Sequence, residues 1–258
     1  MKSRGFTLIE LMTVIVILAV VATAGSRFIV STIQSYNQTQ TRSKLINTGR
    51  QAIERMTRQL RGALPYSLRL TNANACIEFL PIAGGGNYLA DLPDNDNGAS
   101  AAISFATATH AVDFGTAEYV SVGNLASNEV YGGGPVSLAT LGADTPALIT
   151  LTAAKSWQRN SINRRFYLLD NPQAFCVQSG ELRFYQNLDV TAASVPGLAG
   201  ACAETACSIL AQNISGAANF VLASGTEDRN TKVTIGLSFL EGGETVELSQ
   251  GVLIRNVP

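Results

Sequence analysis

The hydrophobic pattern of the chain begins with a long apolar stretch. From Phe6 to Ser26 the only charged residue is Glu10. A helix of about 20 apolar residues spans the hydrocarbon core of a bilayer, so residues 6–26 are predicted to form a transmembrane helix. A carboxylate inside such a span is costly and therefore indicates a functional site.

The residues after the apolar stretch, up to Leu64, keep a helical pattern, but their apolar positions lie on one side only. Its apolar or small positions recur at steps of three and four, which places them on one helical face: Ile46, Gly49, Ile53, Met56, Leu60 and Leu64. No proline precedes Pro65, and Gly62 with Pro65 predicts a helix end. One helix is therefore expected over residues 6–64, about 90 Å long at 1.5 Å per residue. Its front half should face lipid or other subunits, and its back half should pack on a globular domain.

After Pro65 the pattern changes to short β-strands separated by Gly-rich turns. The spacing predicts turn structure at 82–100, which contains Gly84-Gly85-Gly86, and tight turns at Ser179-Gly180 and Glu241–Glu244. Short strands after one helix indicate an α+β fold with a mainly antiparallel sheet in residues 65–258. The candidate strands are 76–80, 102–107, 117–122, 148–152, 165–169, 175–178, 181–185, 220–223, 232–240, 245–248 and 252–255.

Charge is scarce and unevenly distributed. Charged residues make up 14% of the chain and the net charge is −1, which gives no general indication of nucleic-acid binding. Residues 27–64 hold seven basic residues and one acidic residue, a net +6, whereas residues 65–258 hold nine basic and 17 acidic residues, a net −8. The basic helix section is either a solvated surface or a contact for acidic domains of neighbouring subunits.

The residues before the apolar stretch carry the most specific motif. Lys2 and Arg4 precede Gly5, and Phe6-Thr7-Leu8-Ile9-Glu10 follows. This string resembles the class III leader of type IV prepilins and type II secretion pseudopilins. The resemblance implies that prepilin peptidase removes residues 1–5 by cutting between Gly5 and Phe6, and that Phe6 is then N-methylated. It also implies that Glu10 pairs with the N-terminal amine of a neighbouring subunit during assembly.

The strand-rich C-terminal part is similar to J-type minor pseudopilins and to minor pilins of the MSHA pilus system. The resemblance rests on Arg165–Leu169, the Cys176–Tyr185 hairpin, Leu210–Gly216 and the closing residues 252–258. It implies a non-enzymatic minor subunit that initiates or caps a type IV (MSHA-like) pilus, with other major and minor pilins as partners. Because Lys2 and Arg4 precede the span, we expect inner-membrane insertion with a cytoplasmic N-terminus before assembly.

A second interpretation remains open for the same N-terminus. Ala22-Thr23-Ala24 before Gly25 fits a signal-peptidase site that follows a basic and an apolar region. The chain would then be a secreted or membrane-anchored binding domain, such as an adhesin or a DNA-binding tip protein. The candidate basic and aromatic residues for nucleic acid are Arg164, Arg165, Arg183 and Tyr185, but the acidic domain makes this partner unfavourable.

Motifs for catalysis or cofactor binding are weak. His110 is the only histidine, and the Ser-containing elbow motif, zinc spacings, phosphate loops and dinucleotide fingerprints are missing from the sequence. We therefore expect no catalytic residue, cofactor or metal, and a surface or loop position for His110. The acidic segment with Asp91, Asp94 and Asp96 offers oxygen ligands to calcium, with a solvated turn as the alternative, because the order of an EF-hand loop fails.

Four cysteines in an exported chain suggest disulfides. Cys202 and Cys207 can meet across a turn formed by residues 203–206, while Cys76 and Cys176 each lie in an apolar candidate strand. The hypothesis is therefore Cys202–Cys207 and Cys76–Cys176, with two separate buried thiols as the alternative for the second pair.

Overall fold

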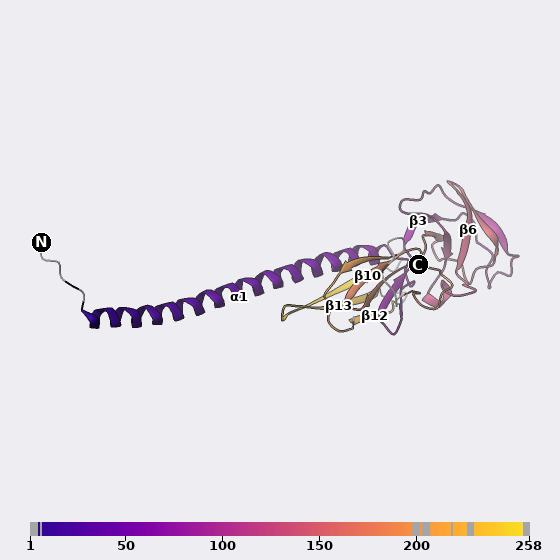
Figure 1. The fold of residues 1–258 in the computed structure, drawn as a ribbon. Helices are drawn as coiled ribbons and strands as arrows, with labels where there is room; N and C mark the ends of the chain where they lie inside the picture. Colours follow the sequence, from indigo (N-terminus) through magenta and orange to yellow (C-terminus); the bar gives the residue numbers. More distant parts are fainter. Residues whose placement is uncertain are drawn as a thin grey trace.

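The protein combines one long helix with a β domain at its far end (Figure 1). The computed structural model describes residues 5, 7–197, 202, 207–217, 219–225 and 230–254. Helix α1, Leu8–Arg61, has 54 residues and is therefore about 80 Å long. Its front half stands clear of the β domain, and its back half lies along it (Figure 1). The expected α+β arrangement is confirmed.

The helix ends three residues earlier than the pattern predicts. The Gly62 amide still donates to the carbonyls of Gln59 and Leu60. Beyond it the chain leaves the helix, because the Leu64 amide donates to the Leu80 carbonyl at 2.8 Å and Ala63 forms a bridge with Pro81. Leu64 is nevertheless fully buried, as its place in the apolar pattern suggests.

The back half of α1 packs on the β domain through the expected face. Its buried positions are Leu45, Gly49, Ala52, Ile53, Met56 and Leu60. Gly49 is the position of closest approach, since a Cβ there would lie 2.8 Å from the Phe239 ring and would also collide with the Leu248 side chain. A residue without a side chain is therefore required at position 49 for the helix to lie against the hairpin of strands Thr231–Glu241 and Glu244–Ile254, which carry Phe239 and Leu248.

Within the described part of the chain, the β domain consists of three antiparallel sheets. A five-stranded sheet has the order β1 (Arg69–Thr71), β2 (Cys76–Phe79), β9 (Gln173–Gln178), β10 (Glu181–Tyr185) and β11 (Cys207–Ala211). A three-stranded sheet consists of β12 (Asn219–Ala223), β13 (Thr231–Glu241) and β14 (Glu244–Ile254). These two sheets and α1 enclose one hydrophobic core.

The third sheet is an insertion between two neighbouring strands of the first. Its six strands all come from residues 82–169, between β2 and β9. Their order is β3 (Ile82–Asn87), β8 (Arg165–Leu169), β5 (Tyr119–Val122), β6 (Leu138–Thr145), β7 (Leu148–Lys155) and β4 (Ala102–Ala106). This sheet has its own aromatic core around Phe105, Trp157 and Phe166, and it lies at the end farthest from the helix start (Figure 1).

The prediction of a turn over Gly84-Gly85-Gly86 is wrong, because these residues belong to β3. A Cβ at Gly84 would collide with the Ala111 carbonyl at 2.5 Å, and one at Gly85 would lie 2.9 Å from the Phe166 carbonyl. The glycines therefore permit close backbone approach within a strand rather than a turn. The expected hairpin turn at Ser179-Gly180 is present, and both residues have positive φ, 52° and 77°.

Candidate functional site: the helix N-terminus

The first turn of α1 organises the motif around Glu10. Thr7 precedes the helix as its N-cap, and its side-chain oxygen accepts a hydrogen bond from the Glu10 amide at 3.3 Å. The Glu10 carboxylate in turn accepts from the Thr7 amide at 3.1 Å and from the Thr7 hydroxyl at 3.0 Å. This reciprocal capping box satisfies amide groups that would otherwise have no partner at the helix start.

Thr7 was not among the residues singled out from the sequence. The Thr-x-x-Glu spacing that begins at Thr7 is nevertheless the sequence pattern of a capping box. In the single chain, therefore, the lone carboxylate of the apolar stretch is held by Thr7 in a defined position at the end of the helix.

The apolar half of α1 has no packing partner among the described residues. Leu8 is 78% exposed and Phe28 is 73% exposed. This stretch is long and apolar enough to cross a membrane, and none of it is buried within the protein. Large exposed apolar surface of this kind requires lipid or other subunits to cover it.

Three of the residues that define the processing motif lie outside the described residues, namely Lys2, Arg4 and Phe6. Gly5 is described and is exposed. Gly5 therefore precedes the first helical residue by three positions and the Thr7 cap by two. The expected cleavage between Gly5 and Phe6 rests on the sequence motif alone.

Comparison with known families bears on this same segment. Residues 1–26 match the family described as the prokaryotic N-terminal methylation motif. This motif, the signal of type IV pilins and pseudopilins, supports membership of that superfamily and points to a pilin-like structural subunit. The chain matches no curated protein and no solved structure.

The cysteines pair in the structure as Cys76–Cys176 and Cys202–Cys207. Cys76 and Cys176 face each other directly in the β2–β9 pairing, and both are fully buried. Their bond therefore joins the two strands between which residues 82–169 are inserted, at the end of the pairing opposite Phe79 and Gln173, where the insertion leaves and returns. Residues 203–206, expected to form the turn of the short pair, lie outside the described residues.

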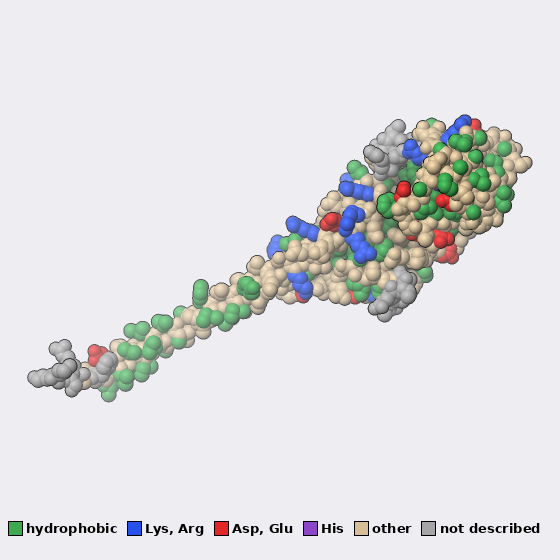
Figure 2. All heavy atoms as spheres, turned by 90° about the horizontal axis from the view of Figure 1, so that it is seen from above, with side chains coloured by type: hydrophobic (Ala, Val, Ile, Leu, Met, Phe, Trp, Pro, Cys, Tyr) green, Lys and Arg blue, Asp and Glu red, His purple; other side chains and the backbone are tan. Residues whose placement is uncertain are grey.

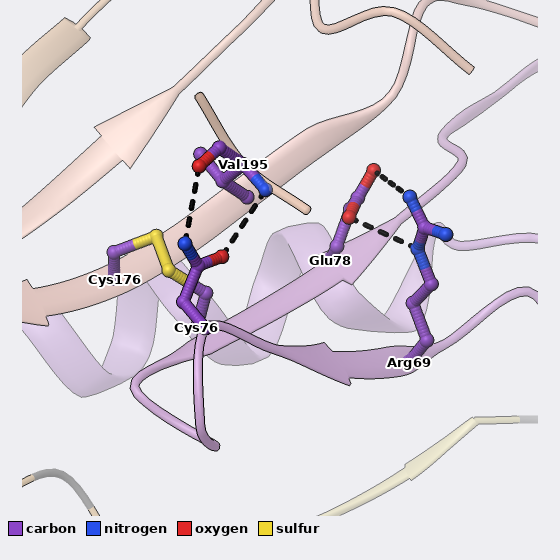
Figure 3. Close-up of a disulfide and its surroundings, with 6 residues drawn as sticks. Arg69, Cys76, Glu78, Cys176 and Val195 are labelled. Atoms are coloured by element: carbon purple, nitrogen blue, oxygen red, sulfur yellow. Dashed lines mark hydrogen bonds and ion pairs between the residues drawn. A yellow bond between two sulfur atoms is a disulfide. The ribbon is translucent and has the colours of Figure 1, made fainter. Parts of the chain in front are cut away.

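A buried ion pair lies close to the Cys76–Cys176 disulfide (Figure 3). Arg69 on β1 and Glu78 on β2 face each other, and Arg69 donates two hydrogen bonds of 3.0 Å to the Glu78 carboxylate. Arg69 also donates to the Ala192 carbonyl at 2.7 Å and stacks on the Tyr131 ring. Burial raises the pKa of Glu78, and the hydrogen bonds and positive charge of Arg69 partly oppose that shift.

The acidic segment 91–98 folds around Asp94, and both oxygens of the Asp94 carboxylate accept hydrogen bonds. One oxygen accepts from the amides of Asp96 and Asn97, and the other accepts from the amide and side chain of Asn160. The Asn160 side chain and these amides hold the pKa of Asp94 below its ordinary value. Among the described residues no cluster of three or more metal-ligating side chains is found. The arrangement therefore favours the turn over a calcium site.

His110 lies in the loop between β4 and β5, as expected, but not at the surface. Its side chain is 1% exposed and its Nε2 lies 2.7 Å from Asp144. Its Nδ1 lies 3.0 Å from the Thr107 hydroxyl, which gives a hydroxyl–imidazole–carboxylate row. Because Thr107 is only 2% exposed, no substrate can reach that hydroxyl. The row joins the loop to β6 and offers no accessible nucleophile.

The residues considered for nucleic-acid binding do not form an exposed basic surface. Arg164 pairs with Asp91, and Arg183 is 7% exposed and donates to Glu181. Tyr185 is 6% exposed, so its ring is not available for stacking on a base. Of the three candidate arginines, Arg165 alone forms no ion pair with a described residue. One unpaired arginine is too little for a phosphate-binding surface.

A cavity of about 170 Å³ lies between the end of the helix and the inserted sheet. Its walls include Tyr66, Leu125 and Tyr167, together with polar residues. Several of these already have partners, whereas the buried Ser161 hydroxyl has none among the described residues. Asn124 donates to the Pro65 carbonyl, and Arg159 is bound to Glu129. These groups stabilise the junction and leave few polar atoms to orient a ligand.

Proposed function

We propose that the protein is a minor pilin or pseudopilin subunit that is processed by prepilin peptidase and assembled through its N-terminal helix. The observation that carries the proposal is the combination of the methylation motif with an uncovered apolar half-helix. A β domain on the other half of the same helix completes the shape of a subunit whose apolar part packs inside a filament.

The details of processing follow from this proposal. Prepilin peptidase cuts between Gly5 and Phe6 and N-methylates Phe6, and residues 6–26 hold the precursor in the inner membrane with a cytoplasmic N-terminus. Glu10 then pairs with the N-terminal ammonium of a neighbouring subunit, because a buried carboxylate is tolerable when it is paired. In the single chain the Thr7 capping box holds the same carboxylate ready.

The more specific proposal is a subunit of an MSHA-like type IV pilus, similar to the minor pilin MshO, that initiates or caps the filament. It is supported by the strand-rich domain and by the C-terminal sequence patterns in 165–169, 176–185 and 252–258. The inserted sheet adds bulk at the end of the domain farthest from the membrane helix, which suits a subunit at a filament end (Figure 1).

A genetic experiment tests the peptidase dependence. The full chain is expressed with and without an active prepilin peptidase, and its apparent mass and membrane location are compared. We expect a shorter form only when the peptidase is active, and a precursor retained in the membrane otherwise. A shortened form of unchanged size in both strains would instead support cleavage after Ala24 and a secreted binding domain.

We also propose that both disulfides form in the exported protein. The Cys76–Cys176 disulfide closes a loop of about 100 residues and should stabilise the fold by a few kcal/mol in the chain-entropy model. Non-reducing peptide mapping tests the pairing. A peptide that joins Cys76 to Cys202 or Cys207 would contradict it, and two alkylatable thiols in the unfolded, unreduced protein would contradict the Cys76–Cys176 bond alone.

A further inference from the structure

We propose that the outer edge of β14 binds an extended segment of a different protein, which adds a further strand to the three-stranded sheet. This surface lies outside the membrane helix and goes beyond the proposed function. The partner is recognised first by its backbone, because an open strand edge presents a row of amide and carbonyl groups to another strand.

The hydrogen bonds of β13 show which residues of β14 turn their backbone outward. The two strands pair residue by residue along all 11 positions of β14, without a shift of register. On β13, the Leu240 amide donates to the Asn213 carbonyl, and the Ser238 carbonyl accepts from the Ser215 amide. Leu240 and Ser238 therefore face away from β14. Because this direction alternates along a strand, the residues of β14 opposite them and at every second position face away from β13: Thr245, Glu247, Ser249, Gly251 and Leu253.

This outward row has no strand partner among the described residues. β14 pairs with β13 alone, and the only other bond to the row runs from the Gln250 side chain to the Gly251 carbonyl. All five residues of the row are exposed. At Gly251 the exposed surface is backbone, since glycine has no side chain. The row is therefore open to a further strand once the Gln250 side chain turns away.

Elsewhere the chain covers its strand edges. The edge of β3 is crossed by Val112, which forms a bridge with Gly84, and the Leu89 amide donates to Ala106 at the edge of β4. β14 is longer than either strand, with 11 residues against six and five. It also contains no proline, lysine or bulge of the kind that protects an exposed edge. These features make β14 a template for an added strand.

A groove of about 400 Å³ lies beside this edge, between β14 and α1. Residues 248–250 form its strand side, and Arg50, Ile53, Glu54 and Thr57 belong to its helix side. A strand added to β14 would place alternate side chains in this groove, over Ile53 and Leu248. Both signs of charge occur over this half of the helix in Figure 2. The groove therefore selects a strand by apolar side chains at alternate positions rather than by net charge.

A second copy of this chain does not suit the edge. α1 runs in the same direction as β14, because Arg42 pairs with Glu244, the first residue of β14, and Gly49 lies beside Leu248. In a symmetric dimer, two identical edges meet across a two-fold axis with their strands antiparallel. The apolar halves of the two helices would then point in opposite directions and could not enter one membrane together. This step rests on the proposed function, and it makes the occupant a different protein.

Substitutions at the edge and in the groove test the surface. Ser249→Pro removes an amide that faces the partner and leaves the bonds to β13 in place, which is where an edge strand tolerates proline. Glu54→Trp fills the groove from an exposed helix position. Gln51→Trp is its matched control, because Gln51 is exposed but does not line the groove. A displayed library of random nine-residue peptides is selected on the full-length protein in detergent, and dissociation constants of the selected peptides are measured for all four proteins.

The selected peptides should carry apolar residues at alternate positions and bind the wild type and Gln51→Trp equally. Ser249→Pro and Glu54→Trp should each weaken binding about tenfold, because one loses a backbone hydrogen bond and the other loses the groove. In nuclear magnetic resonance spectra, bound peptide should slow amide exchange at Glu247, Ser249 and Gly251. The amides of the residues between them already bond to β13 and should change little.

Selected peptides that bind all four proteins equally, or the lack of any peptide that binds, would overturn the proposal. Self-association of the wild type that Ser249→Pro abolishes would also overturn it, since the occupant would then be a second copy. Circular dichroism checks that each variant is folded, and Glu54→Trp keeps the test if the proline disturbs the hairpin. Loss of peptidase processing with intact peptide binding would contradict the proposed function and not this surface.

Discussion

Replacement of Arg69 by Met should destabilise the β domain strongly. The Glu78 side chain is 2% exposed and that of Arg69 is 18% exposed, so the pair is shielded from water. Removal of one partner from a buried ion pair costs about 3–5 kcal/mol, because an uncompensated charge remains. That is a large part of the roughly 5–15 kcal/mol by which a domain is stable. The substitution keeps an unbranched apolar side chain over Tyr131 but loses both bonds to Glu78 and the bond to Ala192.

The loss should depend on pH in a direction set by Glu78. Burial already raises the pKa of Glu78 in the folded protein, and without Arg69 nothing in the pair opposes that shift. A carboxyl whose folded pKa lies above its unfolded value of about 4.3 costs no stability below that value. The cost grows as pH rises through the folded pKa. The deficit of the variant relative to the wild type should therefore be smallest near pH 4 and largest at neutral pH.

Denaturant unfolding of the full chain in detergent, followed by circular dichroism, measures these effects. Arg164→Met is the matched control, because Arg164 and Asp91 form an exposed pair, with side chains 51% and 67% accessible. The control should lose no more than about 1 kcal/mol. Arg69→Met with Glu78→Met should recover much of the loss, since no buried charge remains. A cost for Arg69→Met equal to the control, or one that is independent of pH, would refute this reasoning.

Three further substitutions test the helix and its leader. Glu10→Ala should leave the protein cleaved and membrane-inserted but poorly recovered in sheared filaments, because the ammonium of a neighbour loses its partner; recovery at the wild-type ratio would count against this. Gly5→Val should block processing and leave the precursor in the membrane, since a β-branched side chain restricts the backbone that the peptidase must grip; a product that starts at Phe6 would show the site to be wrong. Gly49→Ala should lower the free energy of unfolding by about 1 kcal/mol, because overpacking against Phe239 outweighs the gain in helix propensity. Gly25→Ala is the control, because its Cβ would meet nothing within 4 Å, and it should cause no such loss. Equal effects of the two substitutions would contradict the packing argument.

The sequence predicted the parts of the fold that depend on local pattern. The apolar repeat through Gly49 and Met56 identified the helix face that is buried, since a 3.6-residue period has one structural solution. Ser179-Gly180 identified a hairpin because few residues accept positive φ at both positions. The predicted helix end was three residues too late, because Leu64 continues the apolar pattern although it no longer belongs to the helix. Its amide donates to the Leu80 carbonyl instead.

The sequence could not predict features that depend on distant neighbours. The glycines of β3 suggested a turn, and only the approach of Ala111 and Phe166 explains them as a strand. The surface or loop position expected for His110 did not anticipate its burial, because nothing in the local sequence indicates that Asp144, on β6, binds its side chain. At the candidate site Glu10 was evident as a lone carboxylate, while the role of Thr7 became clear from the capping geometry.

The mature N-terminus is the most direct test of the central claim. Intact and peptide-level mass spectrometry of the chain, purified from a strain with active prepilin peptidase, identifies the first residue and its modification. Processing as a pilin-like subunit predicts a chain that starts at Phe6 and carries one added methyl group on its amine. A chain that starts at Gly25, or one that still begins at Met1, would contradict it.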